Sequence, residues 1–299
     1  MPASRTAVFA ASLTPFTSSG DIDVPAFVRH VRWLFSNGCD GALLFGTTGE
    51  GLSLSADERI NALSALLDAG LPADRLLVGT GASALPDAVR MSRIATEKGV
   101  RGVLVLPPFH FREIPEAGVF RFYDALIQQV SHAALRLYFY HYPELSGVAI
   151  AFPMIQHLSE RYPEQVAGVK DSSGEWDHTE ALIHSFPDLE VFAGTERLLL
   201  PALQAGGAGC ISATVNRTAP LAAQVHAAWR DGRDATRLQE RLTDLRGSIV
   251  RFPTLAALKQ LCAWKQAMEP IVRPPLVPLP ADRHEALRPV LAKIEAVVA

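Results

Sequence analysis

An amine stands at the end of a short apolar run, Val166-Ala-Gly-Val-Lys170, just before the polar turn Asp171-Ser-Ser-Gly174. Burial disfavours a charged amine, and documented buried lysines have pKa values as low as about 5 to 6. A neutral amine can attack a ketone and form a Schiff base. The simpler alternative is an ion pair with Asp171 or another nearby carboxylate. We predict Lys170 to be the single interior lysine, because the others lie in or beside helical patterns, where lysine usually faces water: Lys98, Lys259, Lys265 and Lys293.

A glycine-rich segment, Gly46-Thr-Thr-Gly-Glu-Gly51, follows a second apolar run. Glycines let backbone amides approach an anion closely, and the hydroxyls of Thr47 and Thr48 add hydrogen-bond donors, so the segment can bind a carboxylate. Its spacing matches neither a dinucleotide-binding motif nor a P-loop, and a nucleotide ligand is therefore not indicated. The alternative is a tight turn between a strand and a helix that binds nothing.

A third candidate is Tyr140, in the segment Tyr140-His-Tyr-Pro143. A phenol beside a Schiff base can pass protons between substrate oxygen, amine and water, which is general acid-base catalysis. Aromatic residues in strands more often serve packing, and Tyr138 is the expected example of that role.

These residues need a scaffold, and the chain alternates short apolar runs with helical patterns, as parallel βαβ units do. Eight units predict an α/β fold, the (β/α)8 TIM barrel, in which the active site lies at the carboxyl ends of the strands. All three candidates end or follow predicted strands, so we expect them at that end. The predicted strands are 8–13, 41–45, 76–79, 102–106, 136–140, 167–170, 191–193 and 210–212.

Helix boundaries are visible in the same pattern. Ser55 and Glu58 predict a reciprocal capping box, and helices are expected to stop at Gly38, Gly70 and Gly99. Strand patterns disappear after about residue 218, where helices are predicted at 218–231, 235–249 and 254–268, followed by a proline-rich connector and a last helix to Ala299. We therefore predict a barrel catalytic domain over residues 1–231 and a C-terminal helical domain over residues 232–299.

Composition narrows the class of partner. Of the 299 residues, 48% are hydrophobic, enough for a large core, and the net charge of -3 without a basic run argues against nucleic-acid binding. No signal sequence and no apolar run of membrane-spanning length is present, so we expect a soluble cytoplasmic protein without a membrane partner. Three widely spaced cysteines predict reduced thiols. The nine histidines form no two-ligand pattern at helix or strand spacing, and the run from Asp171 to Glu180 is expected to be the solvated start of a helix.

Taken together, the motifs resemble the pyruvate-dependent class I aldolases that include dihydrodipicolinate synthase and N-acetylneuraminate lyase. The resemblance covers nearly the whole chain and rests on Ser12-Leu-Thr-Pro-Phe16, Gly46-Thr-Thr-Gly-Glu50, Gly79-Thr-Gly81, Tyr140-His-Tyr-Pro143, Gly168-Val-Lys-Asp-Ser-Ser-Gly174 and Gly206-Gly-Ala-Gly-Cys-Ile-Ser212. It implies a barrel with a C-terminal helical domain, a homo-oligomer (tetramer or dimer), and no metal or organic cofactor.

By the same resemblance, Lys170 forms an imine with a 2-oxo acid and Tyr140 shuttles protons. Thr47 and Thr48 bind the carboxylate, with Thr47 also assigned to the catalytic set. Two further positions are implied as substrate contacts: Gly46 and Ile211.

Departures from the family pattern concern the substrate. Leu145 stands where the synthases carry an arginine that binds the second substrate's carboxylate, which disfavours the synthase reaction. The Leu-Ser-Gly that begins there is shared with N-acetylneuraminate lyase. His110 replaces a family tyrosine of the proton relay, and we expect both His110 and Leu145 to contact the substrate. Glu196 occupies a position where sialic acid lyases bind the polyol, while Arg197 suggests an acidic tail.

The predicted function is a Schiff-base lyase that cleaves or forms a C–C bond next to a 2-oxo acid, with pyruvate as product or donor. The substrate would be a 2-keto-3-deoxy sugar acid or an N-acetylneuraminate-like compound. Three alternatives stay open: 4-hydroxy-tetrahydrodipicolinate synthase, a 2-keto-3-deoxy acid dehydratase, and a catalytically silent sensor of 2-oxo acids. A metal-dependent aldolase is disfavoured by the histidine spacing.

Overall fold

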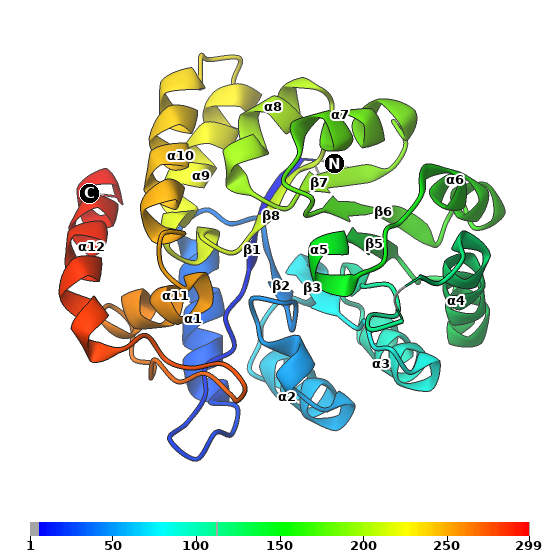
Figure 1. The fold of residues 1–299 in the computed structure, drawn as a ribbon, viewed down its shortest axis with the longest axis horizontal. Helices are drawn as coiled ribbons and strands as arrows, with labels where there is room; N and C mark the ends of the chain where they lie inside the picture. Colours follow the sequence, from blue (N-terminus) through cyan, green and yellow to red (C-terminus); the bar gives the residue numbers. More distant parts are fainter. Residues whose placement is uncertain (1–5, 112, 299) are drawn as a thin grey trace. The chain divides into compact units, whose positions relative to one another are not determined.

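The computed structural model describes residues 6–111 and 113–298, in which eight strands alternate with helices and close into a barrel in the order β1 to β8 (Figure 1). The (β/α)8 prediction is confirmed. The predicted strand ends differ from the observed ones by at most two residues. The strands are β1 (Ala7–Ala11), β2 (Gly41–Leu44), β3 (Leu76–Gly79), β4 (Gly102–Val105), β5 (Leu137–His141), β6 (Val166–Asp171), β7 (Glu190–Ala193) and β8 (Gly209–Ser212).

The helices begin and end largely where their caps predict. Ser55 and Glu58 cap each other's backbone amides, and Gly38, Gly70 and Gly99 have φ values of 89°, 85° and 75° just past helix ends. The α-helices are α1 (Val24–Ser36), α2 (Ala56–Asp68), α3 (Leu85–Glu97), α4 (Glu116–Val130), α5 (Pro143–Ser146), α6 (Phe152–Arg161), α7 (Trp176–Ser185), α8 (Leu199–Gln204), α9 (Val215–Arg230), α10 (Thr236–Ile249), α11 (Thr254–Ala263) and α12 (His284–Val298). Short 3-10 turns are η1 (Gly51–Ser53), η2 (Ala73–Arg75), η3 (Glu196–Leu198) and η4 (Ala281–Arg283).

The chain forms two compact units. The first contains mainly Pro72–Gly194 and Pro201–Gly209, and the second contains Ala7–Leu71, Thr195–Leu200 and residues 210–298. The C-terminal helices thus share a unit with β1, β2 and β8. The proposed division at residues 231 and 232 into a barrel domain and a helical domain stays a prediction.

Within the first unit, β5 and β6 run parallel, with Tyr140 opposite Lys170 and His141 opposite Asp171. Successive side chains of a strand point to opposite faces of the sheet, so these two pairs occupy different faces. Tyr138 lies on the same face as Tyr140, fully buried, and its hydroxyl donates to Glu190 at 2.8 Å. This confirms the packing role expected for Tyr138.

Within the second unit, α12 packs on α9 and α10. Helix α9 starts at Val215, earlier than predicted, because the Thr214 carbonyl already accepts the amides of Arg217 and Thr218. Helix α11 ends at Ala263 and does not reach residue 268 as predicted, since its last amide bonds are those of Trp264, Lys265 and Gln266. The predicted end of the last helix, Ala299, lies outside the described residues.

One sequence prediction about the interior is wrong. Lys259, on α11, has 0% of its surface exposed, so Lys170 is not the single interior lysine. Lys265 and Lys293 are exposed and Lys98 is partly exposed, as expected. Lys259 is buried because oxygen atoms surround its amine and compensate the lost hydration. All three cysteines are buried free thiols, as predicted.

Within the two described ranges, no helix combines the length and the apolar character needed to cross a lipid bilayer.

Candidate active site

Lys170 lies near the carboxyl end of β6 with 4% of its surface exposed, in agreement with the interior position predicted from the sequence. Its Nζ atom stands 4.3 Å from the centroid of the Tyr140 ring. Among the described residues, Nζ has no hydrogen-bond or ion-pair partner, and the alternative pairing with Asp171 does not occur. A buried amine that is bound to no oxygen keeps its nitrogen available for a carbonyl carbon.

Tyr140 reaches the same place from β5, because the strand register sets it directly opposite Lys170. The side chain is buried, and its ring also lies beside that of Tyr142, with a centroid distance of 6.0 Å. A ring face favours a nearby cation, so the Tyr140 ring would stabilise a protonated imine formed on Lys170. The structure therefore brings together the two residues that the sequence assigned to imine chemistry.

A pocket of about 570 Å³ opens beyond the carboxyl ends of β4 and β5. His110 and Leu145, both predicted to contact substrate, line it together, and 42% of Leu145 is exposed. His110 has a φ of 77°, which is rare for a residue other than glycine. The remaining lining residues are Phe109, Glu113, Glu144, Ser146 and Gly147.

The glycine-rich segment lies in the second unit, directly after β2. Its ends approach each other, since the Gly51 amide donates to the Gly46 carbonyl at 3.0 Å. A Cβ on Gly51 would stand 2.0 Å from the Phe45 carbonyl oxygen, so this turn requires glycine. Thr47 is exposed and Thr48 partly exposed, whereas Glu50 points inward. The two hydroxyl residues are thus on the accessible side of a tightly closed turn.

Two further predicted positions lie elsewhere in the second unit. Ile211 is fully buried in β8. Glu196 is also fully buried, and its carboxylate accepts hydrogen bonds from Arg246 at 3.1 Å and from three hydroxyls, those of Ser212, Thr214 and Thr218. This geometry favours a structural role for Glu196, joining β8, α9 and α10, over the predicted substrate contact. Arg197 is exposed.

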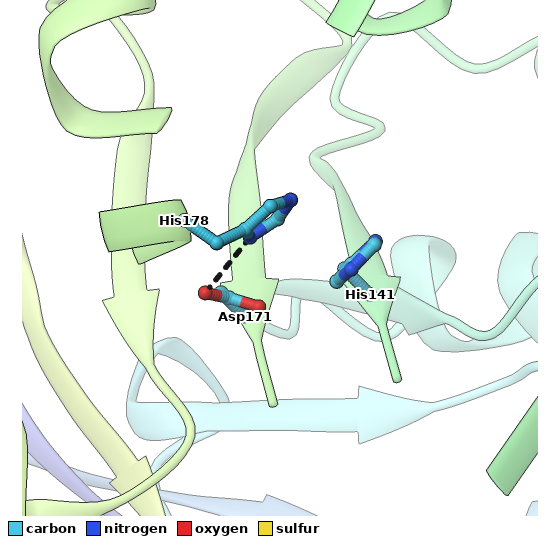
Figure 2. Close-up of side chains that lie close together, drawn as sticks. All are labelled: His141, Asp171 and His178. Atoms are coloured by element: carbon cyan, nitrogen blue, oxygen red, sulfur yellow. Dashed lines mark hydrogen bonds and ion pairs between the residues drawn. The ribbon is translucent and has the colours of Figure 1, made fainter. Parts of the chain in front are cut away.

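A cluster that the sequence did not predict contains His141 on β5, Asp171 on β6 and His178 on α7 (Figure 2). The strand register places His141 and Asp171 on the face opposite to Tyr140 and Lys170. His178 Nδ1 donates to Asp171 at 3.1 Å, and the rings of His141 and His178 stack with centroids 4.4 Å apart. Asp171 is only 2% exposed, so the prediction of a solvated helix start is wrong for this residue. The spacing of the histidines along the chain did not predict this cluster, because His141 is on β5 and His178 is in the first turn of α7. The two side chains meet only in the folded chain.

These three side chains place possible metal-ligand atoms within 4.8 Å of one another. Their hydrogen bonds argue against a metal. Asp171 already accepts from His178, Thr179 and Ser173, and His141 Nδ1 accepts the Ile150 amide at 3.2 Å. Stacked rings also direct their in-plane nitrogen lone pairs past each other instead of toward a common ion. The cluster instead holds the ends of β5 and β6 and the segment after β5.

Burial lowers the pKa of His141 to about 4, with His178 adding to the effect, so His141 is neutral near pH 7 and can accept the Ile150 amide. Burial alone would raise the pKa of Asp171, but hydrogen bonds from His178, Thr179 and Ser173 hold it below the usual value. Asp171 is therefore an ionised acceptor inside the fold.

Comparison with known proteins gives a consistent picture. The model of the dihydrodipicolinate synthetase family matches residues 4–294. An uncharacterized DapA-like lyase from Chloroflexus aurantiacus is 37% identical over 291 residues, 97% of each chain. A 4-hydroxy-tetrahydrodipicolinate synthase from Salinibacter ruber is 33% identical over 273 residues, 90% of this chain and 88% of its own.

Solved structures agree with these relatives. The crystal structure of dihydrodipicolinate synthase from Agrobacterium tumefaciens str. C58 matches with a TM-score of 0.86 and 33% identity, over 98% of this chain and 99% of that one. The barrel, the buried lysine near the end of β6 and the match to the family model all agree with one family. The chain belongs to the dihydrodipicolinate synthetase family and is a class I aldolase or lyase.

Proposed function

We propose that the protein cleaves a 2-keto-3-deoxy sugar acid, or an N-acetylneuraminate-like 2-oxo acid, into pyruvate and an aldehyde through an imine on Lys170. The observation that carries this proposal is the buried Nζ of Lys170, which has no oxygen partner among the described residues and lies 4.3 Å from the Tyr140 ring centroid.

In the proposed reaction, the neutral amine of Lys170 attacks the keto carbon, and the adduct loses water to give a protonated imine. The C3–C4 bond then breaks, its electron pair moves into the imine, and the hydroxyl proton at C4 is removed as the aldehyde forms. The resulting enamine takes up a proton at C3, and water releases pyruvate and the free lysine. Tyr140 moves these protons.

The carboxylate of the 2-oxo acid is assigned to the Gly46–Thr48 turn. Two hydroxyl side chains on its accessible side and glycines that expose backbone amides support this assignment. In the proposal, binding of the carboxylate orients the substrate, and orientation of a bound substrate accelerates reactions of this kind. Ile211 stays a predicted contact, and Glu196 is left out of the proposal.

The residues that line the pocket beyond β4 and β5 support the proposal that the substrate has a polyhydroxylated tail. Its described lining residues include two carboxylates, Glu113 and Glu144, and neither lysine nor arginine. Carboxylates accept hydrogen bonds from hydroxyl groups and repel a second carboxylate. Leu145 provides no charge for the carboxylate of aspartate semialdehyde, and this absence disfavours the synthase reaction.

Borohydride trapping tests the imine. Incubation with pyruvate and borohydride should add a reduced pyruvyl group to Lys170, located by mass spectrometry of peptides, and an unmodified Lys170 would end the proposal. A panel of 2-keto-3-deoxy acids assayed for pyruvate release then identifies the substrate. Loss of water without pyruvate release would instead indicate the dehydratase, and saturable binding with neither reaction would indicate the sensor.

The synthase is the second candidate, because a relative with that name is 33% identical to this chain. Pyruvate and aspartate semialdehyde distinguish the two reactions, since condensation at ordinary enzymatic rates would favour the synthase.

A homo-oligomer, tetramer or dimer, stays a prediction that sedimentation velocity tests. The cytoplasmic location likewise stays a prediction.

A further inference from the structure

A second buried lysine lies outside the proposed imine chemistry. Lys259, on α11, points its amine at the first segment of the second unit. Nζ stands 2.7 Å from the Glu50 carboxylate, donates to the carbonyls of Thr14 and Ile271 at 2.7 and 2.5 Å, and lies 4.2 Å from the Phe16 ring centroid. The two carbonyls accept hydrogen bonds from the ammonium group, and the Glu50 carboxylate forms an ion pair with it. The amine of Lys259 therefore has a structural role, in which it binds Glu50 and the two carbonyls.

Its main partner belongs to the carboxylate-binding turn. Glu50 is the fifth residue of Gly46–Gly51, is 3% exposed, and has a φ of 53° in the left-handed region. Its amide donates to the Thr47 carbonyl at 3.1 Å, which closes the turn around Thr48. The orientation of the two clamp threonines thus depends on where Glu50 is held.

Glu50 is held on both carboxylate oxygens by the C-terminal part of the chain. Lys259 binds one, and the Arg273 backbone amide donates to the other at 2.8 Å. The Arg273 guanidinium continues the attachment by donating to the Gly20 and Ser53 carbonyls and to Glu58. The turn is therefore tied to residues that follow the barrel in sequence.

The charge of Glu50 also needs compensation. A buried carboxylate two and three residues from Thr48 and Thr47 would repel a bound substrate carboxylate, and repulsion is strong where water is excluded. Lys259 neutralises that charge within the fold.

We propose that Lys259 is a positioning residue for 2-oxo acid recognition: through Glu50 it sets the shape and the charge of the carboxylate clamp. This inference rests on the proposed function. The inference assigns a role in substrate binding to α11, a helix of the predicted C-terminal domain. Lys259 acts on binding of the acid and not on the chemistry of the imine.

Three forms of the chain test this role: wild type, Lys259→Met, and the double variant Lys259→Met/Glu50→Gln. Pyruvate is titrated in the presence of borohydride, and the reduced adduct on Lys170 is quantified by mass spectrometry. We expect Lys259→Met to raise the half-saturating pyruvate concentration about tenfold or more. Adduct formation at saturating pyruvate should stay within about threefold of wild type.

The double variant separates charge from packing. It removes the orphaned negative charge, while the side-chain amide oxygen that replaces the carboxylate can still accept the Arg273 amide, so most of the affinity for pyruvate should return. If Lys259→Met does not fold, the double variant alone carries the test. A half-saturating concentration about tenfold above wild type in the folded double variant would then contradict the charge argument.

The matched control is Lys265→Met, because Lys265 is exposed near the end of α11 and pairs with Glu295 on the surface. It should leave the titration unchanged. Wild-type protein without any Lys170 adduct would overturn the proposed function and this inference with it. A normal wild-type adduct combined with an unchanged titration in Lys259→Met would overturn this inference alone.

Discussion

The two units of the chain each bury one lysine, and the two amines have opposite surroundings. Lys170 is 4% exposed and lies against the Tyr140 ring, without an oxygen partner among the residues that the structure describes. Lys259 is 0% exposed and is bound to one carboxylate and two carbonyl oxygens. Burial lowers the pKa of Lys259 in spite of its ion pair with Glu50.

Burial alone therefore does not make a lysine a nucleophile. A lysine whose amine is bound to several oxygens would have to break those contacts before attacking a carbonyl, whereas Lys170 has no such contact with the residues that the structure describes. Lys170, at the carboxyl end of a strand and beside an aromatic ring, is placed to react with a substrate. Lys259, on a helix and in contact with a carboxylate and two carbonyls, is placed to stabilise the fold. Mutations at the two sites should therefore fail in different ways.

Lys170→Met should have the largest effect on catalysis. Without the nucleophile, kcat/KM should fall by at least about four orders of magnitude, and the borohydride adduct should disappear. Since Lys170 makes no hydrogen bond to any residue in the ranges 6–111 and 113–298, the free energy of unfolding should change by less than about 1 kcal/mol. Steady-state kinetics and urea denaturation together check both parts, and a large loss of stability would remove the distinction between the two lysines.

Tyr140→Phe tests the role of the hydroxyl group beside Lys170. The ring that contacts Lys170 is kept and the phenolic proton is lost, so kcat should fall by about 10²- to 10⁴-fold, the range for a general acid-base group. The pyruvate adduct on Lys170 should still form, more slowly. Single-turnover trapping followed by mass spectrometry measures this, and a wild-type kcat would exclude Tyr140 as the proton shuttle.

Lys259→Met should mainly affect stability. Removing one partner of a buried ion pair leaves Glu50 uncompensated and should lower the free energy of unfolding by about 3 to 5 kcal/mol. The surface substitution Lys265→Met should cost less than about 1 kcal/mol. Urea denaturation of both variants checks this. Equal costs would mean that the contacts of Lys259 add little to folding.

His141→Asn extends the same reasoning to a buried neutral group. The folded pKa of about 4 lies below the ordinary 6.5, so the unfolded state binds more protons and wild-type stability falls as the pH drops from about 6.5 to 4. Asparagine can still accept the Ile150 amide but cannot titrate, so about 3 kcal/mol of this pH dependence should vanish. Denaturation curves at several pH values measure it, with exposed His157→Asn as the unaffected control.

Much of the fold followed from local pattern. The eight strands, the capping box at Ser55 and the glycine stops at Gly38, Gly70 and Gly99 were all predicted, because periodicity and cap chemistry act within a few residues. The pairing of Tyr140 with Lys170 was also foreseeable, since both end successive parallel strands. Their roles in the reaction stay predictions.

Other features depended on contacts between distant segments. Lys259 has the helical pattern of a surface lysine, and only the packing of α11 against Thr14 and Glu50 buries it. Glu196 stands where a substrate contact was expected, but the hydroxyls after β8 and Arg246 enclose it. His141, Asp171 and His178 likewise meet only through strand register and the first turn of α7.

Residue type and spacing along the chain were enough to predict the barrel, the helix ends and the kind of chemistry that a strand-end lysine and tyrosine can perform, because these properties are encoded locally. The partners that compensate buried polar groups became apparent from the folded structure alone. Hydrogen-bond partners far apart in the chain set the cost of burying a charge, and spacing along one segment carries no information about them.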